Sequence, residues 1–194
     1  MKAHPEIERK FLVRSFPRKI LSTIPCHYII QGYLALGNPN IRARLQIGPP
    51  FYQPNTSMGA LGGMPDLETR DGWESFLTIK TRSDPNDWRT QKEWETPQLP
   101  PEIAQRVLAQ CQNTSGAWLS KDRYTLGRFA LDVFRKPALR GLAILEVELF
   151  RPDEDVPLPE GFECAEVTDD IRFANQNLAQ LSRSQLILIL AEYR

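Results

Sequence analysis

The segment PEIERKFLV, residues Pro5–Val13, carries the pattern that decides the fold. Side chains of an extended strand alternate between its two faces. One face of this strand would therefore carry Glu6, Glu8 and Lys10 in a row. Because a strand face that packs on a core is apolar, this arrangement predicts that the strand lines a polar cavity.

The same spacing recurs along the chain in segments that are expected to be strands. These segments are residues 27–36, 41–47, 76–82, 88–96, 117–124, 127–134 and 142–150. Their charged positions, two residues apart, are Arg42/Arg44, Lys80/Arg82, Glu93/Glu95, Lys121/Arg123 and Glu146/Glu148, with Asp132 single. One such pair is ordinary on a solvated strand, but six across eight strands indicate a shared charged face. The opposite faces are mostly apolar.

The remaining segments indicate an α+β fold. Residues 15–24, 99–113, 170–181 and 182–193 have helical spacing, and Ser182 is a suitable N-cap for the last of them. Long βαβ alternation is absent from the sequence, which argues against a parallel sheet. We therefore expect one domain over residues 1–194, an eight-stranded antiparallel closed β-barrel or tunnel with helices packed on its outside. The Pro- and Gly-rich residues 49–75 are expected to form a long, mobile insertion.

Composition excludes several functional classes. The 194 residues contain 24 basic and 24 acidic side chains, which argues against a broad nucleic-acid or membrane footprint. The sequence has no apolar run of membrane-spanning length and no signal-like N-terminus, so we expect a cytoplasmic protein. Three separated cysteines and two histidines lack zinc-site spacing. Oligomeric state is left open.

The charges of the predicted tunnel restrict its ligand. Two like charges about 6 Å apart repel by roughly 3 kcal/mol at an effective dielectric constant of about 20. A polyanion relieves that repulsion among the bases, and arginine suits phosphate oxygens. The acids can reach the same polyanion through a hard divalent cation, Mg²⁺ or Mn²⁺. A triphosphate or polyphosphate with metal ions therefore satisfies both sets of side chains.

An ordered series of motifs resembles the CYTH superfamily, also called triphosphate tunnel metalloenzymes, and most of all its small bacterial inorganic triphosphatases. The series spans nearly the whole chain. It consists of EIERKFLV at residues 6–13, QGYL at 31–34, RAR at 42–44, LTIK at 77–80, KEWE at 92–95, KDRY at 121–124, LDVF at 131–134, LEVEL at 145–149 and EVTDDIRFANQNLA at 166–179. The insertion at residues 49–75 departs from the family pattern and leaves the shape of the tunnel mouth open.

The resemblance implies metal-dependent hydrolysis of the terminal phosphoryl group of a triphosphate, with inorganic tripolyphosphate preferred. We expect four metal ligands, Glu6, Glu8, Glu146 and Glu148, and a second set that either binds metal or orients the bases, Glu93, Glu95 and Asp132. The expected phosphate-binding residues are Lys10, Arg42, Arg44, Lys80, Arg82, Lys121 and Arg123. Family members with QGYL suggest a catalytic pair, here Lys10 and Tyr33, acting with Glu6 and Glu8.

Three other functions are compatible with these residues. An adenylate cyclase or a thiamine or nucleoside triphosphatase would use the same tunnel and would need a pocket for its organic group. A polyphosphate-binding module without catalysis would keep the bases and could lose the acids. The retention of Glu6/Glu8 and Glu146/Glu148 favours an enzyme.

Overall fold

The charged N-terminal segment forms one long strand, β1 (His4–Ser15), in the computed structural model of the chain. The structure describes residues 4–54, 72–81, 90–96, 99–114 and 117–194. Eight further strands occupy these ranges: β2 (Cys26–Ala35), β3 (Asn40–Ile47), β4 (Glu74–Thr81), β5 (Thr90–Glu95), β6 (Trp118–Leu126), β7 (Phe129–Phe134), β8 (Ala143–Glu148) and β9 (Glu163–Glu166). The helices are η1 (Arg18–Ser22), α2 (Pro101–Thr114), η3 (Pro137–Leu139), η4 (Ile171–Phe173), α3 (Asn175–Leu178) and α4 (Arg183–Ala191).

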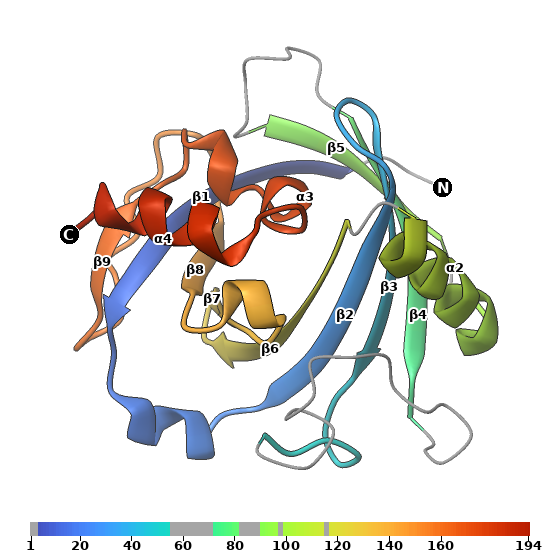
Figure 1. Ribbon diagram of the computed structural model, residues 1–194. Helices are drawn as coiled ribbons and strands as arrows, with labels where there is room; N and C mark the ends of the chain where they lie inside the picture. The colour runs from blue at the N-terminus through green and yellow to red at the C-terminus, as the bar shows by residue number, and fades with distance from the viewer. Residues whose placement is uncertain (1–3, 55–71, 82–89, 97–98, 115–116) are drawn as a thin grey trace.

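The strands form one antiparallel sheet in the order β5-β4-β3-β2-β6-β7-β8-β1-β9. Strand β1 has β8 along one edge, with Glu8 opposite Glu148. Its other edge is divided, because β5 pairs with residues His4–Ile7 and β9 pairs with residues 11–15. The sheet curves strongly, so that β5 and β1 meet (Figure 1).

The prediction of an antiparallel α+β fold is confirmed, but the prediction of a closed eight-stranded barrel is wrong. The described sheet has nine strands, and β5 meets β1 over four residue positions only. The reason is β9, which takes the rest of that edge of β1. The sequence predicts no strand over β9, because its four residues, ECAE, are too few to show a readable period.

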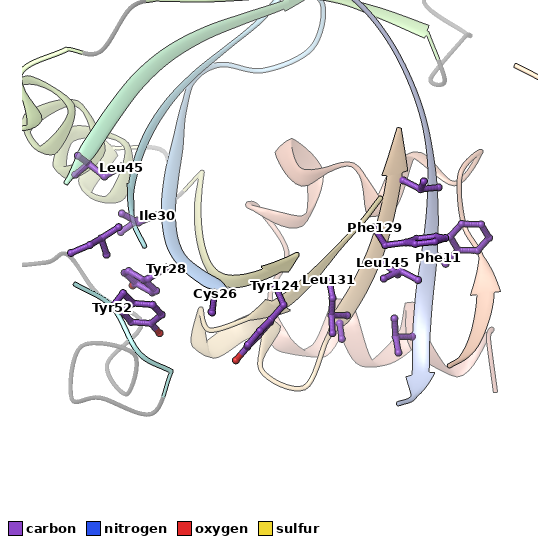
Figure 2. Packing of buried hydrophobic residues seen from close by; sticks show 14 of the residues in the cluster. Phe11, Cys26, Tyr28, Ile30, Leu45, Tyr52, Tyr124, Phe129, Leu131 and Leu145 are labelled. Carbon is purple, nitrogen blue, oxygen red and sulfur yellow. The ribbon is translucent and has the colours of Figure 1, made fainter. Parts of the chain in front are cut away.

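One face of the sheet is apolar and forms the larger core. Buried side chains from β1, β2, β3, β6, β7 and β8 lie on this outer face, and Figure 2 shows several of them, including Ile30, Leu45 and Leu131. Helix α2 packs against β2, β3 and β4 through Ala104 and Leu108. Gly32 permits this close approach, since a Cβ there would stand 2.8 Å from the Cβ of Cys111.

The C-terminal helices occupy the other face, which corrects the expectation that all helices pack outside. Cross-strand registers place Leu12, Phe134 and Ile144 on the same face as the charged residues, each two positions away from one of them. Residues from η4, α3 and α4 pack against these side chains in a second buried cluster. Figure 1 shows these helices gathered within the curve of the sheet, with α2 outside it. The concave face is therefore charged along part of its length and sealed by apolar side chains at one end.

Two predicted features have mixed outcomes. Helix α4 begins after Ser182, which forms a capping box with Gln185, so the predicted N-cap is confirmed. Residues 55–71, most of the predicted insertion, lie outside the described residues. The described flanks of the insertion pack on the outer face, where Tyr52 and Trp73 are both buried beside Tyr28.

Within the described ranges, no helix has the length and apolar character required to cross a membrane.

The apolar seal yields a stability prediction. Leu186→Ala should lower the free energy of unfolding by about 2–5 kcal/mol, because Leu186 is fully buried and its loss leaves a cavity. Leu188→Ala, in the same helix but 69% exposed, should change it by less than about 0.5 kcal/mol. Urea unfolding of both variants measures the difference. Equal losses would show that α4 is not packed as described.

Candidate functional site

The charged part of the concave face surrounds a cavity of about 400 Å³. Side chains from β1, β3, β4, β5, β6 and β8 line it, together with one residue of α3. The lining residues are Glu8, Lys10, Arg42, Arg44, Lys80, Glu93, Glu95, Arg123, Glu146, Glu148 and Asn175. Nearly all of them were predicted from the period-two charge pattern, so the structure brings the predicted residues together around one space.

A compact ionic cluster forms the side of the cavity nearest β1 and β8. Lys10 Nζ lies 2.5 Å from Glu146 Oε1 and 3.0 Å from Glu8 Oε1. Arg123 Nη2 lies 2.5 Å from the other oxygen of Glu146. Burial opposes the charge on Lys10, but the carboxylates of Glu146 and Glu8 outweigh burial and raise the pKa of Lys10. In the same way, Lys10 and Arg123 overcome burial and hold the pKa of Glu146 well below its usual range. Both groups are therefore charged at neutral pH.

The opposite side of the cavity is built from β3, β4 and β5. Arg44 Nη2 lies 2.8 Å from Glu95 Oε2, and Lys80 Nζ lies 2.7 Å from Glu93 Oε2. Arg42 donates to Thr78 Oγ1 at 3.1 Å and lies 3.6 Å from Glu93. Every base on this side thus has an acidic neighbour on an adjoining part of the sheet.

Two donors on this side have no acceptor within the described part of the chain. The Nε atoms of Arg42 and Arg44 are buried and make no hydrogen bond to any residue that the structure describes. Burial, together with the neighbouring positive charge of Arg42, lowers the pKa of Arg44 to about 10. A buried N–H without a partner is costly. Because these two atoms are enclosed by protein, a ligand in the cavity would meet other atoms of Arg42 and Arg44, both of which line it.

Asp132 lies behind the cavity and is not part of its lining. Its side chain is fully buried and forms an ion pair with Lys121. It also receives two hydrogen bonds of 2.7 Å from Arg123. Burial and the nearby charge of Arg123 lower the pKa of Lys121 to about 8. The sequence left two roles open for Asp132, metal binding and orientation of the basic side chains. Its placement favours the second role.

Several predicted residues fall outside the lining. Lys121 is buried beneath the cavity, and Tyr33 packs in the cluster beneath the C-terminal helices. The hydroxyl of Tyr33 accepts a hydrogen bond of 2.6 Å from Gln31, and burial raises its pKa, so the phenol is protonated. Glu6 is placed in β1 by its backbone only, and Arg82 lies outside the described residues.

The sequence alone did not reveal Asn175. This residue comes from α3 and its Nδ2 lies 3.5 Å from Glu146 Oε1, at the base of the cavity. An uncharged residue in a short helix carries no period-two signal. Only its position inside the FANQNLA part of the family-like motif pointed to it.

The lining as a whole is electrically balanced, with five basic and five acidic side chains. The sequence-based expectation was that the bases would repel one another. In the structure each lining base has an ion-pair partner among the described acids. An anionic ligand must therefore compete with these carboxylates or arrive with cations of its own.

The described carboxylates do not form a metal site by themselves. No group of three or more His, Cys, Asp or Glu among the described residues is arranged to hold an ion. Glu8 and Glu148 face each other across β1 and β8, and both line the cavity. Mg²⁺ is commonly bound by one or two carboxylates plus substrate phosphates and water. The pair fits an ion whose other ligands come from a phosphate substrate, but not one held by protein alone.

Comparisons with known proteins agree with this architecture. No family model matches the chain. It is 29% identical over 181 residues to the inorganic triphosphatase of Nitrosomonas europaea, covering 90% of this chain and 96% of that protein. The crystal structure of the inorganic triphosphatase NE1496 covers 91% of this chain and 95% of its own, at 28% identity and a TM-score of 0.53. A second structure of NE1496 gives a TM-score of 0.52 at the same identity, covering 91% of this chain and 99% of its own. These similarities confirm the resemblance that the motifs predicted.

The buried ionic network gives a stability prediction. Asp132→Asn should lower the free energy of unfolding by about 3–5 kcal/mol, because it leaves the buried charge of Lys121 without its partner. Asp153→Asn is the matched control, since the Asp153 side chain is 82% exposed. The control should change stability by less than about 1 kcal/mol. Denaturant unfolding at neutral pH tests both, and a stable Asp132→Asn protein would contradict the network.

Proposed function

We propose that the chain is a metal-dependent hydrolase that cleaves the terminal phosphoanhydride of a triphosphate in the concave-face cavity, with inorganic tripolyphosphate as its main substrate. The observation that carries the proposal is the meeting of two unlike sides in one cavity. One side presents the Arg42 and Arg44 side chains, and the other presents the Glu8 and Glu148 carboxylates. The similarity to a named inorganic triphosphatase over 90% of the chain supports it.

The basic side would hold the phosphate chain. Arginine presents several donors in a fixed plane and so suits phosphate oxygens, whereas lysine acts as a point charge. The Arg42 and Arg44 side chains would donate hydrogen bonds to phosphate oxygens from the cavity wall. Lys80, which lines the same side, would add a third contact.

Charge balance explains why binding would require divalent cations. The cavity lining has no net positive charge to offset a triphosphate. A triphosphate bound alone would bring its negative charges against the acids of the lining. A triphosphate bound as its Mg²⁺ or Mn²⁺ complex would bring cations that face Glu8 and Glu148. We therefore propose that these two residues hold the metal, with Glu6 as a further candidate from the sequence.

The roles of the chain's own residues follow from their protonation. When bound, the ion would supply electrophilic activation of the phosphoryl group. Lys10 is held protonated by Glu8 and Glu146, so at the cavity wall it would donate hydrogen bonds to the departing phosphate and would not act as a base. Arg123 would neutralise charge that develops on the same group. Tyr33 is a protonated phenol behind the lining, and its pairing with Lys10 remains a prediction.

The proposal predicts that phosphate is released from tripolyphosphate in the presence of Mg²⁺ or Mn²⁺ and that EDTA abolishes the release. Glu148→Gln should raise the metal concentration required for half-maximal rate, because it removes one carboxylate of the pair. Glu160→Gln, at an exposed loop position, is the control. Phosphate release is followed while metal is titrated.

Two results would refute this proposal. One is the absence of phosphate release with either metal. The other is identical metal dependence for Glu148→Gln and the control, which would remove the carboxylate pair from the metal site.

The phosphate-binding side gives a separate prediction. Arg42→Ala should raise the dissociation constant of the metal–tripolyphosphate complex by about 10- to 100-fold, since a hydrogen bond to a charged group is worth about 1.5–3 kcal/mol. The fold should survive, because Glu93 still forms an ion pair with Lys80 and Glu95 still forms one with Arg44. Calorimetric titration measures the constant.

Arg9→Ala is the matched control for Arg42→Ala. Arg9 also lies on a strand and is paired with Glu166, but it lies outside the cavity lining. Its loss should leave binding of the metal–tripolyphosphate complex unchanged. Equal effects of the two substitutions would show that Arg42 has no specific contact with the phosphate chain.

A further inference from the structure

The cavity continues beyond the carboxylates into a second compartment of about 380 Å³. The two compartments share Glu8, Arg123, Glu146 and Glu148, which form a common wall. The second compartment is completed by residues of the β6–β7 turn, β7, β8 and the segment after β8, namely Arg128, Ala130, Val147 and Phe150. The apolar seal closes the opposite end of the concave face, so this compartment lies toward the end that the seal leaves uncovered.

Phe150 provides an exposed aromatic ring at this compartment. Its side chain is 87% exposed, and the guanidinium carbon of Arg128 lies 4.5 Å from the centre of its ring. Glu154 holds both residues, because its carboxylate accepts a hydrogen bond of 2.5 Å from Arg128 Nη1 and one of 2.8 Å from the Phe150 backbone N–H. Arg128 Nη2 also donates to the Glu148 carbonyl at 2.9 Å. The aromatic ring is thus largely accessible although its backbone and its neighbour are anchored.

The charges of the second compartment differ from those of the first. Three carboxylates and two arginines line it, and both arginines already pair with carboxylates, Arg123 with Glu146 and Arg128 with Glu154. The first lining is balanced, whereas this one has one more acid than base, so a continuing phosphate chain would meet a lining of net negative charge. A neutral or cationic group would not be repelled. The chemistry of the lining therefore disfavours long polyphosphate here and favours an uncharged or positively charged planar group.

We infer that the second compartment is a subsite for a flat heterocyclic ring joined to the phosphate chain, with Phe150 as the residue that stacks on it. The inference rests on the proposed function, because the triphosphate would lie in the first compartment and its organic end would extend into the second. Stacking on an aromatic side chain tolerates many rings, since every such ring has a π-face. Phe150 would then determine how strongly ring-bearing triphosphates compete with tripolyphosphate.

The test compares two ligands that are not hydrolysed, the imido analogues of ATP and of tripolyphosphate, each titrated with Mg²⁺ into wild-type protein and variants. Phe150→Ala should weaken binding of the ATP analogue relative to the inorganic one by about 5- to 100-fold, the range expected for one stacked base. Phe150→Trp should preserve the ratio, because it keeps an aromatic face. Leu188→Ala, exposed on α4, is the control and should leave the ratio unchanged. Thiamine triphosphate added as a competitor distinguishes a cationic ring from a neutral one.

The outcomes separate the inference from the proposed function. If tripolyphosphate is hydrolysed but Phe150→Ala leaves the ratio unchanged, the subsite is wrong and the function stands. If methyl triphosphate, which has no ring, binds the wild-type protein as tightly as the ATP analogue does, the subsite is also wrong. If neither imido analogue binds, both the subsite and the proposed function fail.

Discussion

The structure depends on the pairing of opposite charges across neighbouring strands of the concave face. Charges removed from water are costly unless a partner of opposite sign lies beside them. Lys10 is placed between Glu8 and Glu146, and Arg123 bridges Glu146 and Asp132. Glu8 and Lys10 pair within β1, but the other ion pairs described for this face join different strands, so the strands require one another in register. A shift of one residue would turn the charged row of a strand into the apolar outer core.

This constraint also determines what kind of site the cavity is. The bases do not form an open positive patch, because each is held by a carboxylate. A ligand has to take over some of these interactions, and only a ligand that combines anions with cations replaces both partners. Arg42 and Arg44 line the side of the cavity where such a ligand would place its phosphate oxygens. The cavity would then select ligands that carry both positive and negative charges in matching positions. A ligand with charges of one sign only would not satisfy the lining.

Much of this arrangement follows from periodicity in the sequence. The alternation of side chains placed Glu8, Lys10, Arg42 and Arg44 on one face before any pairing was known, and the order of family-like motifs supported an antiparallel sheet. Features that depend on tertiary contacts could not be predicted. Two such features produce no periodic pattern in the local sequence. One is the division of an edge of β1 between β5 and β9, and the other is the packing of α3 and α4 into the concave face. Tyr33 illustrates the limit. The family resemblance suggested it as a partner of Lys10, and its pairing with Arg42 puts it on the charged face, but its position along β2 places it under the apolar seal.

The separation in sequence between β1 and β8 has a consequence for how the chain folds. Lys10 and Glu146 are 136 residues apart, and the residues that seal the concave face come later still. Long-range pairing of this kind is slow to form, because the entropy of closing a large loop is lost before the contacts are gained. During synthesis the charges of β1 would remain in water until most of the chain has emerged. Strand β1 therefore acquires its partners β8 and β9 late, whereas strands β2–β7 are contiguous in the sheet and can pair with one another before then.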